Sequence, residues 1–247
     1  MSNLSAVFDN NICRITLLDR TISFEMLRRL NELLDRCENE VSAVVIEGGE
    51  KVFCIGADFR SVSEESSEEY VQNQTARLLY AVFRKLAEGT YVSIACVKGQ
   101  TAAGGMGFVG ACNIAIADEN ATFVLSEMLF GMIPACVYPF LAEKMGTANT
   151  DAMALTTVPI SAAQAHAYGL IQLCSSDTEK TLNTILNRVC HFDKKAIREY
   201  KSYTGKMKLY SKYEEQAVSE NQRMFCDPNI IDNIVRYNKY KLFPWQK

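Results

Sequence analysis

The sequence predicts an α/β fold, and two observations along its 247 residues carry that prediction. Through about residue 175, short apolar runs typical of buried strands alternate with segments whose apolar residues recur at helical spacing. Beyond about residue 178 the strand pattern fades, and several helices are predicted through to the terminal FPWQK. Alternating strands and helices are typical of a layered core, so we expect an α/β core followed by a helical region.

The N-terminal segment is predicted to form a hairpin and then a helix. Short strands are expected at 6–8 and 12–17, joined by the Asp-Asn-Asn turn at 9–11. The following segment, 23–38, is predicted to be a helix because charges separate apolar residues at helical spacing, namely Phe24, Leu27, Leu30 and Leu34.

Four apolar runs predict the buried strands that follow. They are AVVIEGG at 43–49, VSIACVKG at 92–99, IAIAD at 114–118 and ATFVL at 121–125. Between the first two, the acidic and serine-rich stretch SVSEESSEE at 61–69 is predicted to be a mobile loop, and 70–88 a helix.

Composition excludes several classes of protein. The net charge of −3 argues against general nucleic-acid binding, which normally needs a basic surplus. No apolar run reaches the about 18 residues that span a membrane, and the N-terminus lacks a signal-peptide pattern, so we expect a cytoplasmic protein. Nine scattered cysteines without a C-x-x-C pair, and only two histidines, favour reduced thiols and no metal site.

The stretch VKGQTAAGGMGFVGACNIAIAD at 97–118 contains closely spaced glycines. Such glycines let a ligand approach the backbone, or let the chain turn where a side chain could not. The stretch lacks the Lys-Ser/Thr of a Walker A loop and the spacing of a dinucleotide-binding fingerprint, so phosphate binding is disfavoured. The alternatives are a tight turn alone, or backbone amides freed at a helix start and aimed at a developing oxyanion. FCIGADF at 53–59 is a second strand ending in a glycine turn, where the amide of Ala57 would supply a second donor.

Three stretches occur in a fixed order, namely VFCIGADF at 52–59, VKGQTAAGGMGF at 97–108 and SEMLFGMIP at 126–134. With ISAAQAHAYGLI at 160–171, they resemble the enoyl-CoA hydratase/isomerase (crotonase) family over nearly the whole chain. The resemblance implies the crotonase fold, a spiral of ββα units in a core domain at 1–190. It also implies a C-terminal helical region at 191–247 that covers the active site and builds a homotrimer.

The resemblance also implies roles for particular residues. Members of the family stabilise a thioester enolate with two backbone amides, whose positions match Ala57 and Gly104, and Gly105 is expected to bind substrate beside them. Of the two glutamates typical of the family's hydratases, Glu127 matches the second, whereas Gly107 stands at the position of the first. Asp58 matches a position that usually secures the turn.

A closer resemblance is to the PksH-type dehydratases of polyketide β-branching cassettes, for which the run PACVYPFL at 134–141 is the most particular feature. It implies that a 3-hydroxy-3-methylglutaryl group on an acyl carrier protein loses water to give a 3-methylglutaconyl group. A partner decarboxylase of the same superfamily would act next. No metal, nucleotide or redox cofactor is implied, since phosphopantetheine or coenzyme A carries the substrate.

Further residues are candidates for binding the substrate or its carrier. Tyr80, Arg84 and Lys85 are expected near the distal carboxylate, and Asn113 or Cys112 near the leaving hydroxyl. The segment 194–212 holds seven basic residues, among them Lys201 and Lys208, and predicts a basic rim for an acidic carrier protein. The alternatives are an isomerase or hydratase that uses Glu127 alone, a decarboxylase, and a non-catalytic scaffold that binds a carrier.

Overall fold

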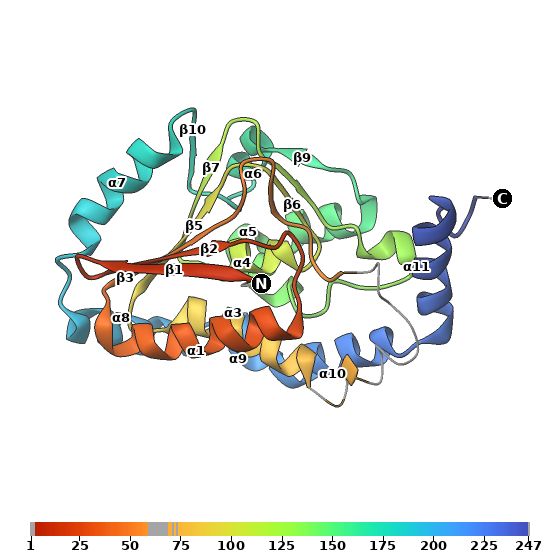
Figure 1. Ribbon diagram of the computed structural model, residues 1–247, viewed down its shortest axis with the longest axis horizontal. Coiled ribbons are helices and arrows are strands. Elements are labelled where there is room, and N and C mark those ends of the chain that lie inside the picture. The colour runs from red at the N-terminus through yellow and green to blue at the C-terminus, as the bar shows by residue number, and fades with distance from the viewer. Residues whose placement is uncertain (1–2, 59–68, 71, 73, 247) are drawn as a thin grey trace.

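The computed structural model describes residues 3–58, 69–70, 72 and 74–246, and it contains two β-sheets covered by helices (Figure 1). The larger sheet has the order β1-β2-β3-β5-β7-β10, with strands Leu4–Asp9, Ile12–Leu17, Ala43–Glu47, Val92–Val97, Ile114–Asp118 and Leu173–Ser175. The smaller sheet has the order β4-β6-β8-β9, with strands Val52–Cys54, Gln100–Ala102, Thr122–Val124 and Ile160–Ser161. All strand pairs are parallel except β1–β2 and β8–β9, as expected of an α/β core.

The predicted N-terminal hairpin and helix are both present. Asn10 and Asn11 have φ angles of 49° and 62°, the left-handed conformation that a two-residue hairpin turn requires and that asparagine tolerates. Helix α1 (Phe24–Glu40) begins at Ser23, whose hydroxyl accepts a hydrogen bond from the N–H of Met26 at 3.2 Å. Of the apolar residues that predicted this helix, Leu27, Leu30 and Leu34 are buried and Phe24 is half-buried, so their pattern marks the face turned to the core.

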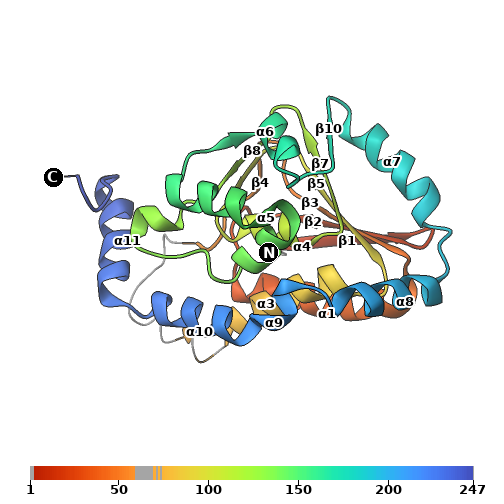
Figure 2. The same ribbon diagram turned by 180° about the vertical axis from the view of Figure 1, so that it is seen from behind.

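Helix α3 (Thr75–Glu88) packs beside α1 below the larger sheet (Figures 1 and 2). Residues 69, 70 and 72 are also helical, in agreement with the helix predicted from residue 70. The loop predicted at 61–69 lies outside the described residues except for Glu69, which is helical.

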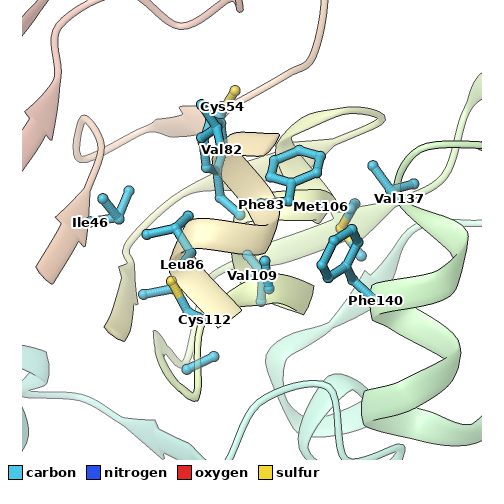
Figure 3. Packing of buried hydrophobic residues seen from close by; sticks show 14 of the residues in the cluster. Ile46, Cys54, Val82, Phe83, Leu86, Met106, Val109, Cys112, Val137 and Phe140 are labelled. Atoms are coloured by element: carbon cyan, nitrogen blue, oxygen red, sulfur yellow. The ribbon is translucent and has the colours of Figure 1, made fainter. Parts of the chain in front are cut away.

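The short helix α4 (Gly105–Ala111) lies at the centre of the apolar core between α3 and α5 (Tyr138–Thr156). Figure 3 shows Phe83 of α3 and Phe140 of α5 flanking this helix. Their ring centroids lie 5.6 Å apart, and Phe83 meets Phe108 edge-on at 5.3 Å. A Cβ on Gly107 would lie 2.2 Å from the Phe83 ring, so this aromatic packing leaves no space for a side chain at residue 107.

Helices dominate the chain after the smaller sheet, as the sequence predicts. They are α6 (Ala162–Ala167), α7 (Thr178–Val189), α8 (Lys194–Gly205), α9 (Leu209–Lys212), α10 (Glu214–Phe225) and α11 (Pro228–Tyr240). Figures 1 and 2 show α7 and α8 at one end of the molecule and α11, with the C-terminus, at the other. The predicted domain boundary at 190 falls between α7 and α8, and the division itself stays a prediction. Within the described residues, no helix combines the length and apolar character needed to cross a membrane.

The packing of Phe83 on α4 predicts that Gly107→Ala is destabilising. The added Cβ overlaps the aromatic ring, and overpacking of this kind costs about 1–3 kcal/mol of unfolding free energy. Gly205→Ala in α8 is the matched control, because no atom lies within 4 Å of its added Cβ. That variant should gain about 0.4–1 kcal/mol from the stiffer backbone. Urea unfolding measures both, and a Gly107→Ala protein as stable as the wild type would contradict the packing.

Candidate active site

Two glycine turns meet just after the ends of β4 and β6, and only glycine permits their contact. Gly56, at the end of β4, has φ of +83°, and a Cβ there would lie 2.9 Å from the backbone nitrogen of Gly104. Gly105 presses against the other side of the same turn, since its Cβ would lie 2.2 Å from the carbonyl oxygen of Cys54. The predicted pairing of the two motifs is therefore a direct backbone contact, and it places Ala57 beside Gly104.

Ala57 and Gly104 both line one pocket. The turn before Ala57 is fixed by a 2.8 Å hydrogen bond from the N–H of Ile22 to the carbonyl oxygen of Gly56. Gly104 directly precedes α4 and follows Ala103, whose φ is 48°. No hydrogen bond from the N–H of Ala57 or Gly104 is found within the part of the chain that the structure describes. The two amides are thus able to donate to a ligand oxygen.

Glu127 faces the same pocket from the first residue of a short 3₁₀ helix, η2 (Glu127–Phe130). The helix ends at Gly131, whose N–H donates to the carbonyl oxygen of Glu127 and whose φ of 82° turns the chain. The carboxyl group is buried, and its Oε2 atom has no hydrogen-bond partner among the described residues. Burial raises its pKa to about 7, an effect that hydrogen bonds from the backbone N–H groups of Glu127 and Ser126 oppose. A carboxyl group with this pKa exchanges protons readily near neutral pH.

The pocket has a volume of about 70 Å³ and a largely apolar wall. Besides Ala57, Gly104 and Glu127, its described lining consists of Ile22, Leu27, Tyr70, Thr75, Leu79, Ala103, Met132, Ile133, Pro134, Cys136, Val137, Asn221 and Phe225. These residues include no lysine, arginine or histidine, and no carboxylate other than Glu127. Any charge that develops in a ligand here therefore meets Glu127 and neutral groups.

The resemblance places the family's first glutamate at Gly107. A larger side chain at this position could not reach the pocket. The Phe83 ring fills the space that a Cβ would occupy, and the surrounding core is apolar. The described pocket wall therefore holds one carboxyl group, whereas the resemblance implied two for a typical hydratase.

The expectation that Tyr80 and Lys85 bind the substrate is wrong for this pocket, because neither residue lines it. Tyr80 is fully buried in the core, where its hydroxyl donates to the carbonyl oxygen of Tyr210 at 2.7 Å. The Lys85 ammonium group pairs with Asp35 of α1 at 2.5 Å. Arg84 is also committed elsewhere, to Glu88 and Glu214. Buried residues occur along the whole of α3, but of these only Thr75 and Leu79 line the pocket.

Asn113 and Cys112 lie instead at the other end of α4, beside a separate cavity of about 630 Å³. Asn113 accepts hydrogen bonds through Oδ1 from the N–H of Ser93 and from the ammonium group of Lys201. Lys201 is buried and also donates to the carbonyl oxygen of Ala87, in the last turn of α3. These contacts satisfy the polar groups of the loop and give Asn113 a structural role. The expectation that it binds the substrate is therefore wrong for the pocket of Glu127.

Sequence reasoning missed three polar residues of the pocket, Tyr70, Thr75 and Asn221. The hydroxyl of Tyr70 donates to Oδ1 of Asn221 at 2.5 Å, and the Tyr70 ring stacks on Phe225 at 4.3 Å. This contact joins the start of the α3 region to α10, two segments 151 positions apart in the sequence. No local motif marks it, because the contact depends on how the C-terminal helices fold back.

No group of three or more His, Cys, Asp or Glu side chains within the described residues could hold a metal ion. In the described structure, the pocket combines two residues with unpaired backbone amides and one buried carboxyl group of raised pKa.

Comparison with known proteins identifies the family of proteins to which a chain with this fold and pocket belongs. The chain belongs to the enoyl-CoA hydratase/isomerase family, whose model matches residues 7–235. It has the crotonase fold and is an enzyme of the hydro-lyase type.

Among its relatives, the chain is 38% identical to the bacillaene synthase dehydratase PksH of Bacillus subtilis (strain 168), over 97% of this chain and 95% of that protein. The crystal structure of a polyketide biosynthesis enoyl-CoA hydratase (PksH) from Bacillus subtilis superposes with a TM-score of 0.90 at 36% identity, covering 98% of this chain and 99% of that one. An enoyl-CoA hydratase from Mycobacterium avium shares the fold, with a TM-score of 0.86 at 23% identity over 99% of this chain and 98% of that one.

The buried carboxyl group predicts two pH dependences. Since only ionised Glu127 can accept a proton, kcat/KM for dehydration should rise with pH through about 7 and then level off. Glu127→Gln should lower this rate at least about a hundredfold. A variant with wild-type activity would contradict the assigned base.

The raised pKa of Glu127 also predicts that the protein loses stability as pH rises. Its folded pKa lies above its ordinary value of 4.5, so its contribution to stability is complete below 4.5 and is lost as pH rises through about 7. The melting temperature of Glu127→Gln, relative to wild type, should therefore increase between pH 5 and pH 8. Exposed Glu119→Gln is the control and should show no such trend.

Proposed function

We propose that the protein is a dehydratase of polyketide biosynthesis, acting on a 3-hydroxy-3-methylglutaryl thioester held on the phosphopantetheine of an acyl carrier protein. The product is the 3-methylglutaconyl thioester. The observation that carries the proposal is the single buried carboxyl group of Glu127, in one pocket with the amides of Ala57 and Gly104. The likeness to PksH over almost the full length of both chains supports the choice of dehydration and of the pathway.

The reaction follows from these three groups. The thioester oxygen accepts hydrogen bonds from the N–H groups of Ala57 and Gly104, and ionised Glu127 removes a proton from the α-carbon. The electron pair of that C–H bond forms an enolate, whose negative oxygen is stabilised by the two amides. One such donor is typically worth about 3 kcal/mol in the transition state. The enolate then re-forms the carbonyl, and the bond from the β-carbon to its hydroxyl group breaks.

The departing hydroxyl needs a proton, and Glu127 carries the one that it has just accepted. Returning this proton releases water and restores the ionised carboxylate, so all atoms and charges balance. Both groups must leave from the face of the substrate that Glu127 contacts. A pKa of about 7 suits a group that both takes and gives a proton.

The proposal needs no metal, nucleotide or redox cofactor, because proton transfer and enolate stabilisation complete the reaction. A decarboxylase of the same superfamily would consume the unsaturated diacid product. We further propose a homotrimer and a cytoplasmic location, in keeping with the family resemblance.

Intact-protein mass spectrometry of a loaded carrier protein tests the reaction. The purified enzyme should cause loss of one water and keep the distal carboxylate. In deuterated solvent, the unsaturated thioester should regain water and take up deuterium at the α-carbon at a rate that depends on Glu127. Release of carbon dioxide would identify a decarboxylase, and a shifted double bond without a mass change would identify an isomerase. Either result would overturn the proposal.

The predicted basic rim for the carrier needs a correction, because Lys201 is buried and Lys208 pairs with Glu143 at 2.8 Å. Lys195 and Arg198 of α8 are exposed, Lys195 making only a long contact of 3.9 Å with Glu199, and we propose them as docking residues. Reversing both to Glu should slow the carrier-bound reaction roughly threefold to tenfold, and added salt should slow the wild type.

The matched control for docking reverses Lys180 and Arg188, which are exposed on α7. Each double variant is assayed on the loaded carrier and on a short pantetheine thioester. Equal loss on both substrates, or equal loss in the control, would contradict docking on α8.

A further inference from the structure

The pocket contains two polar side chains whose hydrogen-bonding capacity is unused and which the proton-transfer steps do not require. Asn221 is 9% exposed, and its amide oxygen accepts from Tyr70, which leaves both protons of its Nδ2 group without an acceptor in the described structure. Thr75 is also 9% exposed, and its hydroxyl has no partner among the described residues. Oε2 of Glu127 is buried without a partner, whereas these two donors keep some exposed surface, so both are open to a ligand that enters the pocket.

The carboxamide of Asn221 is held in one orientation. The hydroxyl of Tyr70 donates to its oxygen, and burial raises the pKa of Tyr70 well above 10, so this hydroxyl remains a donor. Stacking of Tyr70 on Phe225 fixes the ring that carries the hydroxyl. Because the amide oxygen of Asn221 already accepts from Tyr70, the two N–H bonds of its side chain remain to bind a ligand.

Thr75 reaches the pocket from a different element. It is the first residue of α3, whereas Asn221 belongs to α10, and the two helices pack together. The pair therefore adds O–H and N–H donors to the same pocket that holds Glu127.

We infer that the carboxamide of Asn221 and the hydroxyl of Thr75 bind the distal carboxylate of the acyl group and select a carboxylate-ended substrate. This inference rests on the proposed function and names the residues that give it specificity. Neutral donors suit the site, because a lysine or arginine beside Glu127 would stabilise its ionised form and weaken it as a base. A carboxylate accepts such hydrogen bonds strongly, since bonds to a charged group are stronger than neutral ones.

The experiment compares two pantetheine thioesters that differ at the far end of the acyl chain. One is 3-hydroxy-3-methylglutaryl, and the other is 3-hydroxy-3-methylbutyryl, which has no second carboxylate. The measured quantity is the ratio of their kcat/KM values, which reports recognition of the carboxylate and cancels a general loss of activity. The wild-type enzyme should favour the diacid at least about tenfold.

Three variants test the two donors. Thr75→Val and Asn221→Leu each remove donors at nearly constant volume, and each should reduce the ratio about tenfold or more. Asn221→Asp keeps the acceptor for Tyr70 and adds a negative charge, so it should reduce the ratio further. Gln222→Leu, on the same helix but outside the pocket wall, is the control and should keep the wild-type ratio.

The outcomes distinguish the proposed substrate from the inferred role of Asn221 and Thr75. A wild-type enzyme that dehydrates both thioesters equally, or neither, contradicts the proposed substrate. A wild-type preference for the diacid that persists in Thr75→Val, Asn221→Leu and Asn221→Asp overturns the inference and leaves the proposed substrate standing. Melting temperatures identify any unfolded variant, and Asn221→Asp retains the contact with Tyr70 that Asn221→Leu loses.

Discussion

The backbone contact between Gly56 and Gly104 is the constraint on which the rest of the site depends. It brings two strand ends so close that a Cβ on Gly56 would overlap both Ala103 and the nitrogen of Gly104. Amides in such a contact are fixed by the covalent chain and need no side chain to orient them. Preorganised donors cost little reorganisation when charge develops on a ligand oxygen. The glycines therefore allow the contact, and the groups that it positions are the backbone amides of Ala57 and Gly104.

Burial around this contact determines the behaviour of the only carboxyl group in the described pocket wall. Glu127 begins a short helix that Gly131 ends, so its backbone is fixed on both sides by local hydrogen bonds. The apolar wall removes water from the carboxylate and raises its pKa to about 7. The same close packing that shields Glu127 also places Phe83 against Gly107, so a second carboxyl group has no space there. One acid–base group and an apolar core are thus two results of one packing arrangement.

The sequence predicted the fold, and its motifs singled out three residues that the structure brings to one pocket, while their catalytic roles stay predictions. Alternating apolar runs gave the strands, helical spacing gave α1, and the ordered motifs gave Ala57, Gly104 and Glu127. The predictions for Tyr80 and Lys85 were wrong because helical spacing does not say which turns of a buried helix reach a cavity. Asn113 and Lys201 carry groups typical of binding sites, but here they satisfy carbonyl oxygens at helix ends. Asn221 could not be predicted, because its place in the pocket depends on a contact with Tyr70 across most of the chain.

A pocket with one carboxyl group restricts every other group in its wall. In the proposed reaction Glu127 holds a proton between the two bond-breaking steps, so its two charge states must be close in free energy near neutral pH. A cation in the wall would stabilise the ionised state and oppose the first proton transfer, whereas a second anion would oppose return of the proton. Neutral amides, hydroxyl groups and apolar side chains are the groups that leave this balance intact, and the described wall consists of them.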